Sequence, residues 1–229
     1  MLSAIIVAAG SSQRMGFDKL RADLLGRPVL AWTVAAFEAC QAVAEIVLLT
    51  HAGAESEIED LIERERFAKV GKVLAGGAAR HLSVWNGLQA LDPAAEFVAV
   101  HDGARPLTTP TLIESCLARA TATGAACAAA PVTDTIKRAD PAGQVTASVD
   151  RTGLWAMQTP QIFSVSLLRR AYEAVLAAGA VVTDEASAVE QLGEPIALVA
   201  NDDWNLKITY PRDLELAQQL LLLRRGAAC

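Results

Sequence analysis

The sequence predicts an α/β protein with a mostly parallel sheet that is covered by helices on both faces. Candidate strands and helices alternate along the 229 residues, which is typical of βαβ units. The first apolar run, Ala4–Ala8, has no polar alternation and therefore predicts a strand buried on both faces. Apolar residues make up 52% of the chain and can fill one large core. We therefore expect a single domain over residues 1–229.

The predicted elements follow one another in a regular order. Strands are expected at Ala4–Ala8, Glu45–Thr50, Lys72–Leu74, Phe97–Val100, Ala126–Pro131 and Ile196–Val199. Helices are expected at Val29–Ala39, Ala54–Glu65, Leu82–Ala90, Pro110–Thr123, Val165–Ala178, Glu185–Leu192 and Pro211–Leu223. Thr109 before Pro110 is typical of an N-cap followed by proline in the first turn. Asp213 and Glu215 suit the positive start of the last helix.

One segment, Thr133–Val149, interrupts the alternation. It is polar and β-branched, and Asp140-Pro141-Ala142-Gly143 in its middle predicts a turn, so the segment is expected to form a β-hairpin. A lone two-stranded ribbon is marginally stable in water, so it needs a surface to pack on. A second copy of the protein is one candidate, and a solvated excursion over its own domain is the other.

Composition limits the class of partner and the compartment. A net charge of −6 argues against binding along a nucleic-acid backbone, although a local cationic pocket could still hold a small anion. Cys40, Cys116, Cys127 and Cys229 have no metal-site spacing, which favours a reduced, cytoplasmic setting. No apolar run is long enough to span a bilayer, so we expect no membrane partner.

The loop after the first predicted strand has the character of a phosphate cradle. Gly10, Ser11 and Ser12 allow backbone N–H groups to approach a phosphate, and Arg14 and Lys19 add positive charge. The loop is neither a Walker A motif nor a dinucleotide fingerprint, because Gly-Lys-Ser/Thr and the G-x-G spacing are absent. Two solvated loop cations remain the alternative interpretation.

A second polar group follows the predicted strand Phe97–Val100. Asp102 is expected at a strand's carboxyl end, where one carboxylate can hold Mg²⁺ whose other ligands are substrate phosphates. Alternatively, Asp102 caps its own turn. Arg105 either binds a phosphate or pairs with a carboxylate, and His101 is expected to be packed or hydrogen-bonded rather than to act as a ligand.

Three further segments carry candidate binding residues. Gly76-Gly77 permits close backbone approach to a flat ligand, and Ser83 could bond a base, unless the segment is an ordinary turn in which Arg80 or Ser83 caps the helix. Lys207 lies in a strand-like run, Asn205–Thr209, either partly enclosed or snorkelling. Thr183 precedes a helix start that Asp184 is expected to cap, and it could contact an anionic substrate.

Together these segments resemble the 2-C-methyl-D-erythritol 4-phosphate cytidylyltransferases of the non-mevalonate isoprenoid pathway. The matching pieces occur in the family's order and cover nearly the whole chain. They are Ala8–Lys19, Gly76-Gly77 with Arg80 and Ser83-Val84, Val100–Pro106, Pro131-Val132 with Asp134-Thr135, Asp150–Gln161, Thr183–Ser187, and Asn205–Thr209 with Pro211 and Asp213-Leu214.

The resemblance implies a Rossmann-like domain with a protruding β-arm, at about residues 133–150, that clasps a second subunit in a homodimer. It also implies that CTP, Mg²⁺ and methylerythritol phosphate are the ligands. The reaction would be in-line attack of a substrate phosphate oxygen on the α-phosphorus of CTP, with pyrophosphate as leaving group. A phosphate monoester is already ionised at neutral pH, so no strong general base is required.

The resemblance also implies roles for individual residues. The cations Arg14 and Lys19 would contact the triphosphate, and Asp102 would hold Mg²⁺. The cytidine pocket would be lined by Ala8, Ala9, Gly10, Gly77 and Ser83. Positions around the methylerythritol phosphate would be Arg105, Thr135, Arg151, Thr159 and Lys207. Thr135 lies on the arm and would serve the partner subunit's site.

The sequence departs from the family's pattern at three places. Asp18-Lys19-Leu20 stands where the family usually has Pro-Lys-Gln, which puts an anion beside the key lysine. Ala78 occupies a position that is often polar, and Trp204 stands where a smaller residue is common. These departures remove none of the residues to which the resemblance assigns a role.

Other functions compete with this interpretation. The nearest is a cytidylyltransferase for another polyol phosphate such as ribitol 5-phosphate, and molybdopterin- or sugar-phosphate nucleotidyltransferases are more distant. From a different class, the chain could be a nucleotide-binding regulatory domain without catalysis. A dinucleotide oxidoreductase fits poorly, because the G-x-G spacing is missing and Glu38 is the first carboxylate in the predicted Val29–Ala39 helix.

Overall fold

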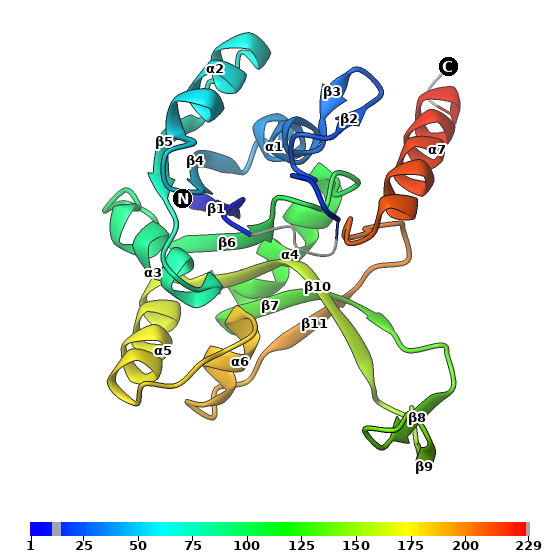
Figure 1. Ribbon diagram of the computed structural model, residues 1–229. Helices are drawn as coiled ribbons and strands as arrows, with labels where there is room; N and C mark the ends of the chain where they lie inside the picture. Colours follow the sequence, from blue (N-terminus) through cyan, green and yellow to red (C-terminus); the bar gives the residue numbers. More distant parts are fainter. Residues whose placement is uncertain (11–14, 228–229) are drawn as a thin grey trace.

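The structure is a computed structural model that describes residues 1–10 and 15–227. Within these residues a seven-stranded sheet has the order β11-β7-β10-β6-β1-β4-β5 (Figure 1). Its strands are β1 (Leu2–Val7), β4 (Val43–Thr50), β5 (Val70–Ala75), β6 (Phe97–Asp102), β7 (Ala125–Pro131), β10 (Trp155–Ser164) and β11 (Ala197–Ala200). All neighbouring pairs are parallel except those of β10. The predicted α/β class with a mostly parallel sheet is confirmed.

Helices cover both faces of this sheet (Figure 1). They are α1 (Val29–Ala39), α2 (Glu55–Glu65), α3 (Arg80–Ala90), α4 (Pro110–Thr123), α5 (Val165–Ala177), α6 (Glu185–Glu190) and α7 (Pro211–Ala227). The predicted caps are confirmed: the Thr109 hydroxyl accepts a hydrogen bond from the amide of Leu112, and Asp184 caps α6 through the amide of Ser187. α3 begins at Arg80, earlier than the expected Leu82.

Strand β1 lies between two separate hydrophobic clusters. Because successive side chains of a strand point to opposite faces, Ala4 and Ile6 join a cluster with α1, α2, α4 and α7. Ile5, between them, joins the other cluster with α3, α5 and α6. All three side chains are fully buried. The apolar run at the start of the chain is therefore a central strand with helices on both sides, as expected.

Strand β10 was not expected from the sequence. It pairs antiparallel with both β6 and β7, and its pairing with β7 is irregular between Met157 and Gln161. Polar residues and Pro160 interrupt the apolar character of this segment, so local pattern does not favour a strand. A small hairpin, β2 (Asp23–Leu24) and β3 (Arg27–Pro28), was also not expected.

The predicted hairpin forms the arm, made of β8 (Ile136–Ala139) and β9 (Val145–Val149). The two strands pair only with each other, antiparallel, among the described residues. The arm projects away from the body of the molecule beyond β7 and β10 (Figure 1). Most of its residues are exposed, so this chain's own core does not cover it.

His101 is a core residue of β6. It is fully buried, and its ring lies against Phe37 of α1 with 4.9 Å between ring centroids. Burial disfavours the charged imidazole and lowers the pKa of His101 to about 3. The ring is therefore neutral and packed, which is one of the two states expected for it.

We expect His101 to make folding stability fall as the pH drops from 6 to 5. Its folded pKa lies below the unfolded value of about 6.5, so the unfolded chain binds the extra proton, with a slope approaching about 1.4 kcal/mol per pH unit. Urea unfolding at several pH values measures this slope. His101→Leu should reduce it, whereas His51→Gln should retain it. An unchanged slope in His101→Leu would contradict the prediction.

Candidate active site

The candidate site lies where the strand order changes direction. From β1, the chain runs outward to β4 and β5 on one side and returns to β6 on the other. Ligands of open α/β sheets bind at such a point, outside the carboxyl ends of the strands. The parallel register pairs Val7 at the end of β1 with Asp102 at the end of β6. The loop that begins at Ala8 and the Asp102 carboxylate therefore lie next to each other.

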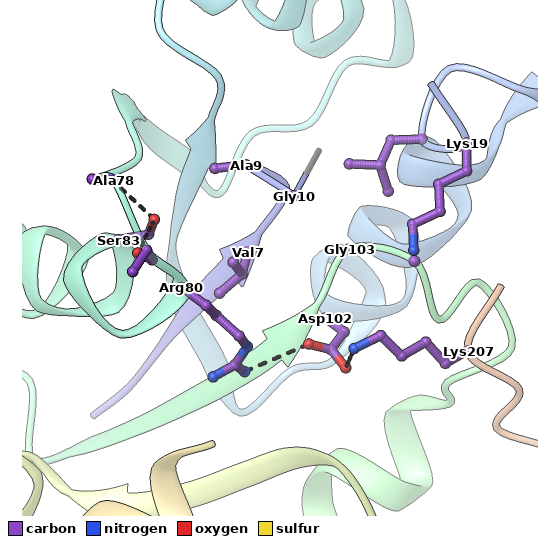
Figure 2. Close-up of a pocket in the computed structure, with 14 residues that line it drawn as sticks. Val7, Ala9, Gly10, Lys19, Ala78, Arg80, Ser83, Asp102, Gly103 and Lys207 are labelled. Atoms are coloured by element: carbon purple, nitrogen blue, oxygen red, sulfur yellow. Dashed lines mark hydrogen bonds and ion pairs between the residues drawn. The ribbon is translucent and has the colours of Figure 1, made fainter. Parts of the chain in front are cut away.

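A cavity of about 330 Å³ opens at this edge (Figure 2). It is lined by Val7, Ala9, Gly10, Lys19, Leu20, Gly77, Ala78, Ala79, Arg80, Ser83, Asp102, Gly103, Ala104 and Lys207. Segments from both ends of the chain thus meet around it. Three lysine or arginine side chains and one carboxylate give the lining a net positive charge, which suits an anionic ligand.

Asp102 is the centre of the site's charges. Its side chain is almost buried, yet Lys207 Nζ lies 2.8 Å and Arg105 Nε 3.4 Å from Oδ2, and Arg80 Nη2 lies 3.5 Å from Oδ1. Burial alone would raise the pKa of Asp102, but these cations hold it well below its usual range. Asp102 therefore remains an ionised carboxylate throughout the neutral pH range.

A magnesium ion could be held here only with help from a ligand. Among the described residues no group of three or more His, Cys, Asp and Glu side chains could by itself hold a metal. Asp102 offers one ionised carboxylate that faces a cavity. One carboxylate combined with substrate phosphates is a common way for proteins to bind Mg²⁺. The residues present therefore fit a metal that arrives with a nucleotide.

The glycine-rich wall of the cavity depends on close packing. A Cβ on Gly76 would lie 2.4 Å from Ala9 Cβ, and one on Gly77 would lie 2.6 Å from Leu82 Cβ. Both positions therefore require glycine. The Ser83 hydroxyl accepts a hydrogen bond from the Gly77 amide at 3.0 Å. Ser83 thus lines the cavity and also holds the Gly77 backbone in place. It does not cap α3, whose N-cap residue is Ala79 and makes no side-chain hydrogen bond.

Lys19 is held at the cavity by a hydrogen bond to a segment near the end of the chain. Its Nζ donates to the carbonyl of Ile208 at 2.9 Å, so the first loop reaches the segment that carries Lys207. The neighbouring Asp18 pairs with Arg21 at 3.0 Å and accepts a hydrogen bond from the Leu20 amide. The negative charge beside Lys19 is thus balanced locally. Arg14, the other predicted cation of this loop, lies outside the described residues.

Arg105 and Thr159 support Asp102 instead of lining the cavity. The Thr159 hydroxyl accepts a hydrogen bond from the Asp102 amide at 3.1 Å, and Arg105 donates to the carbonyl of Asn205 at 2.7 Å. Asn205 in turn donates to the carbonyl of Thr159 at 2.7 Å. For Arg105, carboxylate pairing was one of two expectations, and it is the one that the structure contains. Asn205 was not singled out as a site residue from the sequence.

Other predicted site residues lie away from this cavity. Ala8 is buried and lines a neighbouring cavity of about 240 Å³. Arg151 is exposed at the base of the arm, where it donates to the carbonyl of Thr133, and Thr135 is exposed just before β8. Thr183 is exposed, and its hydroxyl lies 3.3 Å from that of Ser187. The structure therefore brings together only part of the predicted set.

Two corrections concern residues of the site's outer wall. Lys207 does not lie in a strand; Asn205–Thr209 is an irregular segment whose Ile208 amide bonds the carbonyl of Ala104. Arg80, expected at most to cap its helix, instead points at Asp102 and pairs with Glu185 at 2.7 Å. In the sequence, only the position of Arg80 next to Gly76-Gly77 indicated a role at the site. Its pairing with Glu185 could not be predicted, because the two residues are 105 positions apart.

Comparisons with known proteins identify the family to which this chain belongs. The model of the 2-C-methyl-D-erythritol 4-phosphate cytidylyltransferase family matches residues 2–223. The chain is 42% identical to the cytidylyltransferase of that name from Synechococcus elongatus, over 98% of this chain and 97% of the relative. It is 44% identical to that of Thermosynechococcus vestitus, over 96% of this chain and 95% of the relative.

Solved structures give the same result. The 4-diphosphocytidyl-2C-methyl-D-erythritol synthase from Anaerococcus prevotii superposes with a TM-score of 0.84 at 32% identity, covering 96% of this chain and 98% of that one. The cytidylyltransferase from Thermus thermophilus gives a TM-score of 0.78 at 33% identity, covering 95% and 98%. The family model, the relatives and the solved structures agree, so this chain belongs to the 2-C-methyl-D-erythritol 4-phosphate cytidylyltransferase family and is a nucleotidyltransferase.

Proposed function

We propose that this enzyme binds CTP in the cavity beside Asp102 and transfers CMP to 2-C-methyl-D-erythritol 4-phosphate. The products are 4-diphosphocytidyl-2-C-methyl-D-erythritol and pyrophosphate. The observation that carries this placement is one ionised carboxylate, Asp102, in a cavity that is otherwise cationic and has a glycine wall. A flat base needs close backbone approach, and a triphosphate needs both cations and a site for its metal.

The cytidine half of CTP is assigned to the glycine-rich side of the cavity. Ala9, Gly10, Gly77 and Ser83 line it there. The glycines let the backbone approach a planar base, and Ser83 keeps the wall in shape through the Gly77 amide. Ala8, although carried over from the family's pattern, acts from behind this wall as a buried packing residue.

The phosphates are assigned to the opposite side, where Lys19 and Lys207 line the cavity. Asp102 would hold Mg²⁺, whose charge offsets that of the triphosphate oxygens. Lys19, with Arg14, neutralises the charge that develops at the α-phosphorus during attack. Stabilisation of the developing charge by preorganised cations is usually the largest single contribution to the rate in sites of this kind.

The attacking group needs no base from the protein. The acceptor's phosphate is ionised at neutral pH, so the site must only align its oxygen with the α-phosphorus and screen the charges. The nearby imidazole, His101, is buried and neutral, which agrees with the absence of a proton-transfer step. Lys207, Arg151 and Thr183 are assigned to the acceptor side. Arg105 and Thr159, which the family's pattern also places around the acceptor, would act there through their contacts with Asp102.

Residues 1–229 form one catalytic domain in this proposal, and the arm at about 133–150 joins two copies into a homodimer. Support comes from the arm's exposure and from its protrusion beyond the body (Figure 1). A polar ribbon in this position is suited to reach a neighbouring molecule. Thr135 on the arm would then contribute to the acceptor site of the partner subunit.

A reduced, cytoplasmic setting is part of the same proposal. Among the described residues Cys40, Cys116 and Cys127 are buried free thiols. Burial raises the pKa of Cys116 to about 12, so this thiol is unreactive at neutral pH. In addition, no described helix combines the length and apolarity that crossing a bilayer requires.

A panel of nucleotides and acceptors tests the substrates. We expect pyrophosphate release with CTP and 2-C-methyl-D-erythritol 4-phosphate, and its loss when Mg²⁺ is removed by a chelator. ATP, GTP and UTP in place of CTP, and ribitol 5-phosphate as acceptor, are the comparison arms. Turnover with another nucleotide and none with CTP would refute the assignment, as would full activity without a divalent cation.

Lys19→Ala tests the phosphate side of the cavity. We expect kcat to fall on the order of 10²–10³-fold, or about 3–4 kcal/mol, because a preorganised positive charge is lost from the transition state. Steady-state kinetics and thermal unfolding are measured together, and Lys72→Ala, on the edge strand β5, serves as the control. A Lys19→Ala enzyme within a few-fold of the wild type would remove Lys19 from this role.

Mixing two inactive variants tests the arm. If Thr135 serves the partner's site, heterodimers of Lys19→Ala and Thr135→Ala chains contain one intact site. After unfolding and refolding together, the mixture should regain about one quarter of wild-type activity, because half of the dimers are heterodimers with one working site each. Each variant refolded alone is the control. No recovery, or a monomer in light scattering, would contradict the shared site.

A further inference from the structure

Glu185 is a buried carboxylate outside the cavity. It is the first residue of α6 and has no exposed surface. The Arg80 guanidinium binds this carboxylate through two parallel hydrogen bonds, here called the fork, with Nη1 2.7 Å from Oε1 and Nη2 3.0 Å from Oε2. The Tyr172 hydroxyl donates to Oε1 at 2.9 Å. A buried carboxylate with this many donors is held in one orientation.

The helix start that carries Glu185 is itself fixed to the sheet. Gln161, a buried residue of β10, donates through Nε2 to Asp184 Oδ2 at 2.9 Å. Its Oε1 accepts a hydrogen bond from the Ala186 amide at 3.0 Å. The residues on both sides of Glu185 are therefore bound to one side chain of the central sheet, so that the carboxylate cannot move without breaking these contacts.

Arg80 connects this fixed carboxylate to the cavity. Its Nη2 lies 3.5 Å from Asp102 Oδ1, whereas Lys207 approaches the other oxygen, Oδ2, at 2.8 Å. Figure 2 shows Arg80 and Lys207 on opposite sides of Asp102. An arginine side chain has many rotamers, but the paired hydrogen bonds from Arg80 to Glu185 hold it in one of them. The cation on this side of the Asp102 carboxylate, Arg80, is therefore held in place by Glu185.

We propose that Glu185 is a positioning residue of the nucleotide site: by holding Arg80 it fixes the orientation of the Asp102 carboxylate from the side opposite Lys207. The inference rests on the proposed binding of CTP beside Asp102. Its consequence is that α6, which contributes no residue to the cavity lining, sets the affinity for CTP. The affinity for the acceptor phosphate should depend on it little.

In Glu185→Gln the direction in which the Kd for CTP changes distinguishes a positioning role from a simple effect of charge. Removing a negative charge near the site would by electrostatics alone tighten the binding of a triphosphate. Loss of the charged fork frees Arg80, and we expect the Kd for CTP to rise about tenfold. Calorimetry with CTP and Mg²⁺ but without acceptor measures it. Unchanged or tighter binding would overturn the proposal.

Kinetics and two control variants distinguish positioning from a general loss of structure. In Glu185→Gln the KM for CTP should rise while the KM for the acceptor stays within about twofold. Tyr172→Phe removes one donor but leaves the fork, so it should lower the melting temperature and keep CTP affinity within about twofold. Glu190→Gln, exposed on the same helix, should change neither. Equal weakening of CTP binding in Tyr172→Phe would indicate a merely structural role.

A double-mutant cycle with Arg80→Met tests the connection itself. In that background Glu185→Gln should weaken CTP binding no further, because the group that it positions is absent. Additive effects would show that Glu185 acts by another route. Should Glu185→Gln not fold, Arg80→Lys carries the test: it keeps the charge, loses the fork and should show the same rise in Kd, and wild-type affinity would overturn the proposal.

CTP binding by Asp102→Asn shows whether a negative result with Glu185→Gln contradicts only this inference or the proposed nucleotide site as well. If Asp102→Asn leaves CTP binding in Mg²⁺ unchanged, the proposed site itself is wrong. If Asp102→Asn weakens CTP binding while Glu185→Gln leaves it at the wild-type value, the nucleotide site stands and only the positioning role of Glu185 fails.

Discussion

The carboxylate of Asp102 and the cations around it are the interaction on which the site's architecture depends. A nearly buried charge is costly unless it is paired and hydrogen-bonded. Here the partners come from α3, from the turn after β6 and from the irregular segment before α7. Satisfying one carboxylate therefore ties together parts of the chain that are distant in sequence, and it leaves a compact cationic cavity where they meet.

The same carboxylate is exposed enough to meet a ligand because of the sheet's geometry. Parallel pairing of β1 with β6 sets Asp102 beside Val7, so the first loop and the carboxylate open on the same edge. On the glycine-rich side of the cavity, the backbone at Gly76 packs closely against Ala9. Backbone proximity on one side and fixed charge on the other suit a ligand that is flat at one end and anionic at the other.

Much of the fold followed from local pattern. The apolar run of β1, the cap at Thr109 and the polar hairpin of the arm were predicted correctly, because burial on both faces, capping and turn chemistry act over a few residues. Strand β10 was missed, since polar residues and Pro160 interrupt its apolar character, and only pairing with β6 and β7 makes it a strand. Long-range pairing overrides local preference there.

The site divides in the same way. The kinds of residue at the site could be predicted from the sequence: glycines and small residues after a buried strand, Asp102 at the end of another strand, and enough cations to bind phosphates. Which of these residues come into contact depends on how the chain folds. The tertiary structure placed Arg105 and Thr159 behind Asp102, paired Asp18 with Arg21, and joined Arg80 to Glu185 across a large separation in sequence. The physical reason is that ion pairs and buried hydrogen bonds depend on distance in space, which local sequence patterns do not specify.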